Sequence, residues 1–145
     1  MMGFIIALIS GTLMSIQGVF NTGVTKQTSL WIANSFVQFT GFLLCLSVWF
    51  VKERNQSFFN LWKVEPKYFL LGGIIGAGIT MTVIKSMSAL GPAKAVMVIV
   101  TAQIVVAYLI ELFGLFGTQK VDFCWSRLVG LLMTIGGIVI FKWKT

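Results

Sequence analysis

Five long runs of apolar residues, separated by short polar segments, dominate the pattern of this chain. They cover about residues 3–24, 30–51, 67–88, 93–116 and 124–142. Each run is close to the roughly 20 residues that an α-helix needs to cross the hydrocarbon core of a bilayer. The pattern therefore predicts an all-α membrane protein with five transmembrane helices in a single domain over residues 1–145.

Proline and tryptophan positions help to mark the ends of these helices. Pro92 lacks a backbone N–H and disfavours helical geometry at Gly91, so Gly91 and Pro92 predict a helix break between the third and fourth runs. Tryptophan collects at the two headgroup levels of a membrane. Trp31 with Trp49, and Trp125 with Trp143, bracket two of the runs, in each case 18 positions apart. That spacing is about 27 Å along a helix, close to the hydrocarbon thickness.

The composition excludes an ordinary soluble enzyme. The chain is 57% hydrophobic and only 10% charged, and its mean hydropathy is +0.94, whereas soluble domains are about 25% charged. It contains no histidine, which is the commonest proton shuttle and metal ligand. Cys45 and Cys124 lie inside apolar runs, and no nucleophile–base pair, phosphate loop or dinucleotide motif is present. We therefore expect no enzymatic activity, no cofactor and no bound metal.

Small and polar residues share one face of several expected helices. Hydrocarbon gives apolar helices little reason to associate, so close approach through small residues has to supply the attraction. Glycines on such faces of the first, third and fifth helices are expected to pack helices together: Gly11, Gly18, Gly72, Gly76, Gly130 and Gly137.

Amide side chains inside the spans are candidates for recognition of a solute. Gln17 and Asn21 lie one turn apart on the polar half of the first helix and could offer donors and acceptors to a shared site. Alternatively, their sole role could be to form hydrogen bonds with neighbouring helices. Both interpretations stay open. Asn34 and Gln38 repeat the spacing on the second helix, where we favour a packing role.

Glu111 is the only acidic residue well inside an expected span. Gln103 shares a narrow face of the fourth helix with it. A carboxyl group in low dielectric holds a proton more readily, so Glu111 could bind a proton or a cation in alternation. Alternatively it lies near the helix end and pairs with Lys120 or Arg127. Lys85, near the end of the third run, is expected to extend its long stem to the headgroups.

The net charge is +7, and the basic residues are scattered singly over short loops. This pattern indicates contact with a membrane surface, and we expect no nucleic-acid partner. With five spans, the N-terminal side holds six cations: Lys52, Arg54, Lys63, Lys67, Lys120 and Arg127. The other side holds five: Lys26, Lys85, Lys94, Lys142 and Lys144. So small a difference predicts that the chain can insert in both orientations. An oppositely oriented second copy would then recreate the two inverted halves of many transporters.

The order of motifs over nearly the whole chain resembles the YdcZ-type five-helix branch of the drug/metabolite transporter superfamily. The resemblance rests on Gln17-x-x-x-Asn21, Leu70-Leu71-Gly72-Gly73 with Gly76, Leu90-Gly91-Pro92-Ala93, Gln103 with Leu109 to Gly114, and Arg127 to Gly130 with Gly136-Gly137. It implies a half-size version of a ten-helix exporter, paired as an antiparallel homodimer or paralogue heterodimer. Where related sequences more often have aspartate followed by histidine, this chain has Glu111-Leu112, and Lys85 stands at a usually apolar position.

These expectations combine into one functional hypothesis. The chain would be a secondary exporter of small organic metabolites or drugs in the cytoplasmic (inner) membrane, coupled to protons or cations by alternating access. Gln17, Asn21 and Gln103 would line the substrate site, and Glu111 would bind the coupling ion. The expected partners are a small organic solute, the lipid bilayer and a second copy or paralogue. The alternative is a non-transporting membrane subunit whose glycine faces dock on a larger partner.

Overall fold

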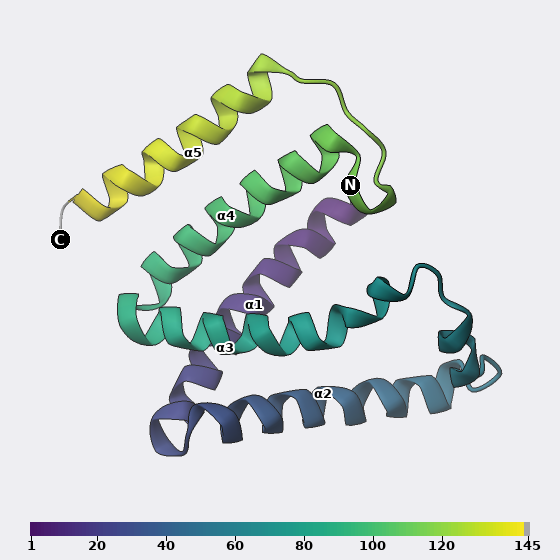
Figure 1. Ribbon diagram of the computed structural model, residues 1–145. Helices are drawn as coiled ribbons and strands as arrows, with labels where there is room; N and C mark the ends of the chain where they lie inside the picture. Colours follow the sequence, from purple (N-terminus) through teal and green to yellow (C-terminus); the bar gives the residue numbers. More distant parts are fainter. Residues whose placement is uncertain (144–145) are drawn as a thin grey trace. The chain divides into compact units, whose positions relative to one another are not determined.

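The computed structural model describes residues 1–143, and the side chains of residues 1–141, as a succession of helices (Figure 1). The five α-helices are α1 (Met2–Gln27), α2 (Leu30–Lys52), α3 (Gly72–Leu90), α4 (Pro92–Phe113) and α5 (Trp125–Trp143). Three short 3-10 helices lie in the connections: η1 (Phe58–Lys63), η2 (Lys67–Leu71) and η3 (Leu115–Gly117). Residues 1–143 contain no strand, so the prediction of an all-α protein is confirmed.

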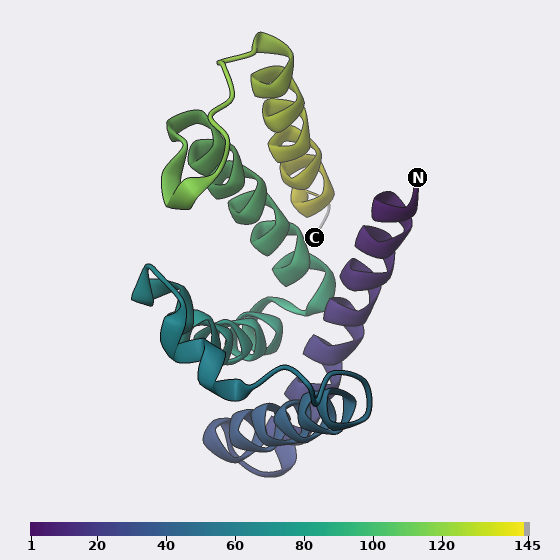
Figure 2. The ribbon, with the colours of Figure 1, turned by 90° about the vertical axis from the view of Figure 1, so that its right-hand side faces the viewer.

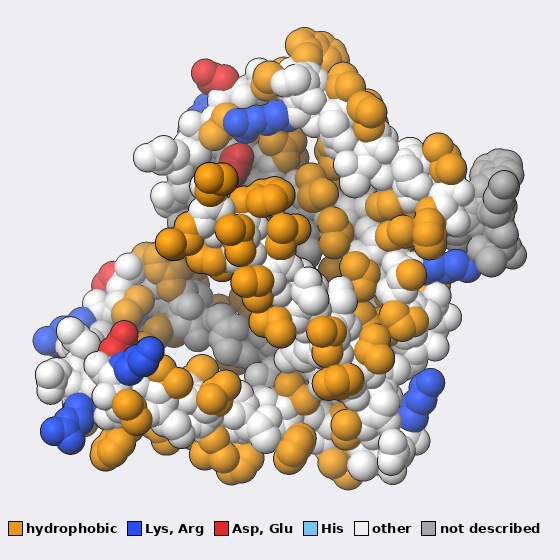
Figure 3. All heavy atoms as spheres, turned by 180° about the vertical axis from the view of Figure 1, so that it is seen from behind, with side chains coloured by type: hydrophobic (Ala, Val, Ile, Leu, Met, Phe, Trp, Pro, Cys, Tyr) orange, Lys and Arg blue, Asp and Glu red, His pale blue; other side chains and the backbone are white. Residues whose placement is uncertain are grey.

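Within residues 1–143, four helical segments are long and apolar enough to cross a membrane: α1, α2, the continuous Lys67–Leu90 segment and α4. The apolar part of α5, Trp125–Phe141, is shorter. Most large hydrophobic side chains point outward (Figure 3), as expected where lipid surrounds the helices. The chain is thus a multi-pass membrane protein, and a fifth crossing stays a prediction.

Several helix ends differ from those expected from the sequence. The run from Lys67 begins as the 3-10 helix η2, and the α-helix starts only at Gly72. α4 ends at Phe113 and not at 116, because Gly114 takes a left-handed conformation (φ 64°). Its N–H then bonds back to carbonyls of the last turn, which stops the helix. At the other end, α4 begins at Pro92, and Gly91 separates it from α3 with φ 80°.

Residues Met1–Ala89 form one compact unit, which contains α1, α2 and nearly all of α3. Its apolar core is small and includes Ala33, Ile84 and Met87. Polar residues are buried beside it in the same unit: Asn21, Thr22 and Asn34. α3 contacts both other helices, since Met87 lies against Gly18 of α1 and the carbonyl of Ala77 binds Asn34 of α2.

A second compact unit begins at Leu90 and contains α4 and α5. The two helices contact each other and run antiparallel (Figures 1 and 2). Residues from the start of α4 and the end of α5, such as Lys94, Met97 and Ile138, line one small apolar hollow of about 50 Å³. The assignment of residues 1–145 to a single domain stays a prediction.

Candidate functional site

The residues predicted to form the site fall into two groups. Gln17 and Asn21 lie on α1 in the first unit, and Gln103 and Glu111 lie on α4 in the second. We refer to the amides Gln17, Asn21 and Asn34 of the first unit as the amide residues, and to Glu111 with Arg127 as the charged pair.

Two amides of the first unit are almost completely buried. Asn21 is 7% exposed and Asn34 is 5% exposed. The Nδ2 of Asn34 donates to the carbonyl of Ala77 on α3 over 3.2 Å, and the Nε2 of Gln38 donates to the hydroxyl of Thr80 over 3.5 Å. The packing role favoured for Asn34 and Gln38 is therefore confirmed.

The buried amides retain unused hydrogen-bonding capacity. The Oδ1 of Asn34 is buried without a partner among the residues that the structure describes. The side chain of Asn21 makes no hydrogen bond within residues 1–141. Leaving a buried polar atom unpaired costs about 1–3 kcal/mol. Such groups are suited to binding a donor supplied by another molecule.

Gln17 and Asn21 also line an open hollow of about 430 Å³, a volume in the range of about 300–1,000 Å³ typical of ligand pockets. The remaining lining residues are Leu13, Met14, Ile16 and Phe20. All six belong to α1. The hollow consequently has one wall, and a ligand enclosed here would need a second wall from elsewhere.

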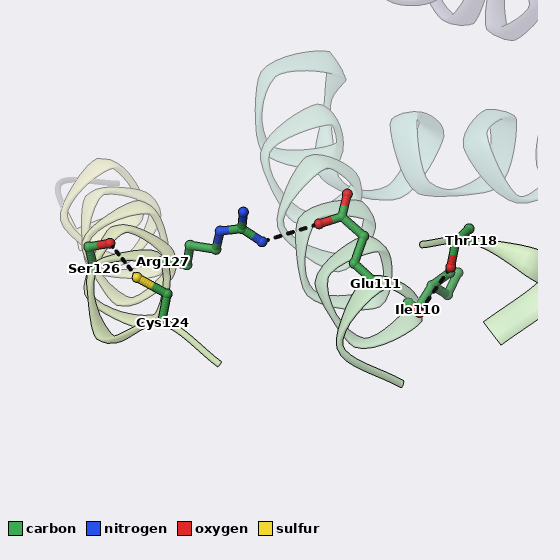
Figure 4. Close-up of polar contacts among 6 residues, drawn as sticks. All are labelled: Ile110, Glu111, Thr118, Cys124, Ser126 and Arg127. Carbon is green, nitrogen blue, oxygen red and sulfur yellow. Dashed lines mark hydrogen bonds and ion pairs between the residues drawn. The ribbon is translucent and has the colours of Figure 1, made fainter. Parts of the chain in front are cut away.

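Glu111 and Arg127 connect the end of α4 to the start of α5 (Figure 4). The Nη1 of Arg127 lies 3.4 Å from the Oε2 of Glu111, and both side chains are about half exposed, at 46% and 51%. Of the two partners considered for Glu111 from the sequence, Arg127 is the one within ion-pair distance. Because α4 ends at Phe113, Glu111 lies in the last turn of its helix, and the expectation that it lies well inside a span is wrong.

The connection after α4 folds back over this helix end. The hydroxyl of Thr118 donates to the carbonyl of Ile110 over 3.3 Å, and the backbone N–H of Val121 donates to the carbonyl of Glu111 over 3.0 Å. The connection thereby satisfies carbonyls that a helix end leaves unpaired. It holds Glu111 facing the first turn of α5, where Arg127 is placed (Figure 4).

The thiol of Cys124 lies directly before α5, outside the helix. Its Sγ is 2.9 Å from the hydroxyl oxygen of Ser126 (Figure 4). This side-chain hydrogen bond, together with backbone N–H groups of the first turn and the charge of Arg127, lowers the pKa of Cys124 below its ordinary value. A larger fraction of this thiol is therefore ionised near neutral pH.

Gln103 is exposed on α4 and makes no hydrogen bond within the described part of the chain. It precedes Glu111 by eight residues, which is about 12 Å along a helix, so the two side chains do not share one contact site. Between them, the hydroxyl of Tyr108 is buried without a partner among residues 1–141. Tyr108 is a candidate that the sequence interpretation missed, although a polar tip within an apolar run was a usable signal.

Arg127 and Asn34 were likewise not proposed as functional residues from the sequence. Arg127 was considered only as an ion-pair partner of Glu111, and for Asn34 a packing role was favoured over recognition of a solute. The Oδ1 of Asn34 is buried without a partner anywhere in residues 1–141. Only the structure shows that this atom is left to accept a hydrogen bond. No pattern in the sequence distinguishes a half-satisfied amide from a fully satisfied one.

The six glycines expected to pack helices differ in their surroundings. A Cβ at Gly18 would meet the side chains of Met87 and Val83 of α3. At the other five positions a Cβ would meet nothing within 4 Å: Gly11, Gly72, Gly76, Gly130 and Gly137. Within the described chain, only Gly18 of these six lies at a close helix–helix contact.

One family model matches almost the whole chain, over residues 2–140, and its description is "Putative inner membrane exporter, YdcZ". The matched range includes the amide residues and the charged pair. No curated protein and no solved structure matches the chain.

Proposed function

Because the chain belongs to the YdcZ family of inner membrane exporters, we propose that it exports small organic solutes in exchange for protons. It acts as a membrane transporter rather than an enzyme, and it lies in the inner membrane. The proposal includes a solute site formed by amides, a coupling carboxylate and an assembly of two chains.

In this proposal α5 is the fifth span. Its apolar stretch begins at Trp125, which is exposed as an interfacial anchor would be, and Trp143 follows 18 positions later. A helix of 19 residues is about 28 Å long, close to the hydrocarbon thickness. Five spans put the two termini on opposite sides of the membrane.

The functional assembly is an antiparallel pair of chains, formed with a second copy or a paralogue. Two observations support it. Five glycines on helix faces have no neighbour that a Cβ would touch, so these faces are open to close approach by another helix. The hollow at Gln17 and Asn21 has a single wall, and a second chain would supply the other.

Gln17, Asn21 and Gln103 bind the solute, with the Oδ1 of Asn34 as an additional acceptor. Amide groups of this kind recognise hydroxyl, amine or amide functions through hydrogen bonds. They carry no charge, so they favour solutes whose polar groups are hydrogen-bonding donors and acceptors. Neutral sites of this kind also release the solute readily, as an exporter requires.

The ion pair between Glu111 and Arg127 is the single observation that carries the coupling. Glu111 is the only carboxylate within any of the five α-helices, and its partner lies on the next helix, 3.4 Å away. Protonation removes the charge of Glu111 and weakens the bond between the end of α4 and the start of α5. A proton entering at Glu111 would thus favour a separated arrangement of this helix end and the start of α5, by no more than the free energy that the ion pair contributes.

Proteoliposomes test this coupling even while the identity of the substrate is open. A defined mixture of amino acids, organic acids, sugars and cationic dyes is enclosed, and mass spectrometry follows the loss of each compound with and without an imposed proton gradient. The wild-type chain should accelerate the loss of at least one compound, and an inward proton gradient should increase that rate. Glu111→Gln should remove the response to the gradient.

Glu65→Gln is the matched control, because Glu65 also forms an exposed ion pair, with Lys67 at 3.0 Å, but lies outside the helices. It should retain the full response. An undiminished response in Glu111→Gln contradicts the coupling role. If no compound leaves faster than from protein-free liposomes, the transport proposal itself fails and the docking of a non-transporting subunit on a larger partner is favoured.

A further inference from the structure

The segment that joins the second and third spans lies at one surface of the membrane. α2 ends at Lys52, and the next membrane-crossing helical segment begins at Lys67 (Figure 1). Between them the chain forms the short helix η1 and two loops, all within the first unit (Figure 2). We call residues 52–71 the surface segment; it includes η2, which is the first part of the next membrane-crossing segment. Since α2 and the Lys67–Leu90 segment both cross the bilayer, the surface segment cannot lie far from the headgroups.

The surface segment exposes an unusual number of aromatic side chains. Phe59 and Trp62 of η1 are each 77% exposed. Together with Phe58, Leu61 and Leu70 they line an open, largely apolar hollow of about 510 Å³. Tryptophan, which is apolar apart from its indole N–H, is stabilised at the boundary between headgroups and acyl chains, and phenylalanine is apolar throughout. This surface is therefore suited to lipid and not to water.

Contacts with α2 hold this aromatic surface in place. The indole N–H of Trp49, on the last turns of α2, donates to the carbonyl of Gln56 over 3.0 Å. The Trp49 ring also contacts Phe58 edge-on, with 4.5 Å between ring centroids. The start of η1 is thus tied to the end of a membrane-crossing helix, which fixes its depth at the interface.

The surface segment is also cationic. It contains Lys52, Arg54, Lys63 and Lys67 against Glu53 and Glu65, a formal net charge of 4 − 2 = +2. Lys67 is occupied, because its Nζ contacts Glu65 at 3.0 Å and the carbonyl of Trp62 at 2.6 Å. Lys52, Arg54 and Lys63 form no ion pair within residues 1–141. Three cations without an ion-pair partner, in the same segment as the exposed aromatic residues, match the charge of phosphate groups in anionic lipid.

We propose that the surface segment binds anionic phospholipid. Phe59 and Trp62 insert at the level between headgroups and acyl chains, while Arg54 and Lys63 bind phosphate oxygens. Neither a transported solute nor a second copy of the chain takes part, so this inference does not depend on the proposed function.

Tryptophan quenching in vesicles of defined composition tests the proposal. The full chain is reconstituted in equal parts of phosphatidylglycerol and phosphatidylcholine, with bromine on the acyl chains of only one of the two lipids. The difference between wild type and Trp62→Phe isolates the fluorescence of Trp62. Bromine on phosphatidylglycerol should quench Trp62 more than bromine on phosphatidylcholine, because the anionic lipid is enriched beside it.

Charge variants show whether Arg54 and Lys63 cause this enrichment. Each cation near an anionic surface contributes on the order of a fivefold preference, so the Arg54→Gln/Lys63→Gln pair should lower the preference by about 25-fold at low salt. Lys26→Gln/Lys85→Gln makes the same charge change elsewhere in the first unit and should leave the quenching ratio at Trp62 unchanged. Circular dichroism confirms that both double variants keep their helices.

Three outcomes would overturn the proposal. Equal quenching by the two brominated lipids would show that no anionic lipid is enriched at the surface segment. An equal loss of preference in both double variants would show that overall charge, and not Arg54 and Lys63, attracts the lipid. Shielding of Trp62 from both brominated lipids would show that protein or water covers it.

Discussion

At the scale of single residues, Gly18 is the position where two helices approach most closely. A Cβ at Gly18 would lie 2.6 Å from the sulfur of Met87 and 3.3 Å from a methyl group of Val83. Met87 is buried, at 4% exposed, so its side chain has little room to move. The side chain that is absent at Gly18 is thus what allows α1 and α3 to pack.

We predict that Gly18→Leu destabilises the chain by about 1–3 kcal/mol, because overpacking forces buried side chains out of their rotamers. Gly23→Leu is the matched control on the same helix, since nothing lies within 4 Å of a Cβ there. It should not destabilise, and the better helix propensity of leucine should add up to about 0.8 kcal/mol. Thermal unfolding in detergent measures both; equal losses of stability would contradict the close contact at Gly18.

Asn34 offers a second test at this scale. Its Nδ2 bond to Ala77 crosses from α2 to α3, and interhelical hydrogen bonds in membrane proteins contribute about 0.6 kcal/mol on average and up to about 1.7. Asn34→Ala should therefore lower the free energy of unfolding by that order. Gln38→Ala should have a smaller effect, because the bond of Gln38 to Thr80 is long, at 3.5 Å, and exposed. A larger loss for Gln38→Ala than for Asn34→Ala would contradict this ranking.

At the scale of elements, the sequence predicts where helices occur better than where they end. Apolar runs are long because they must cross hydrocarbon, so each of the five runs corresponds to an α-helix. The end of α4 depends on Gly114 adopting φ 64°, and Gly117, three residues further on, could have served equally well. The 3-10 geometry of Lys67–Leu71 carries no distinct hydrophobic period, so the sequence predicts one continuous helix there.

The candidate site was predictable only in part for a related reason. Gln17 and Asn21 were identified because amides are rare in apolar spans, and the structure buries Asn21. The pairing of Glu111 with Arg127 depends on an eleven-residue connection, Gly114–Cys124, folding back on α4. Such a contact between separate elements leaves no periodic signal in the chain.

The ion pair between Glu111 and Arg127 gives a prediction about stability that complements the transport experiment. Glu111 and Arg127 are about half exposed, and ion pairs in that setting contribute about 0–1 kcal/mol. Glu111→Gln and Arg127→Gln should therefore each change the free energy of unfolding by less than about 1 kcal/mol. If a variant loses coupling but keeps a free energy of unfolding close to that of the wild type, the loss reflects the missing ion pair and not unfolding. Unfolding of either variant under assay conditions would contradict the small stabilisation assigned here.

At the scale of the whole molecule, the orientation of the chain in the membrane decides which assembly is possible. With the five proposed spans, the two sides would differ by a single cation, six against five, which is too few to enforce one orientation. An antiparallel pair of identical chains requires that about half of the molecules insert each way. A single orientation would leave only a paralogue as the antiparallel partner.

The two natural cysteines report on this orientation without any engineering. Cys124 is exposed directly before α5, and its hydrogen bond with Ser126 lowers the pKa of the thiol, which favours its reaction with a maleimide. Cys45 lies in the interior of α2, where hydrocarbon excludes a charged reagent. A membrane-impermeant maleimide applied to intact spheroplasts should thus label Cys124 in about half of the molecules if both orientations occur, and the remainder after permeabilisation.

Cys124→Ser should abolish labelling in both conditions, and Ser126→Ala should slow it at neutral pH by removing the hydrogen bond that stabilises the thiolate. Complete labelling from outside, or none before permeabilisation, would establish one orientation and exclude an antiparallel homodimer.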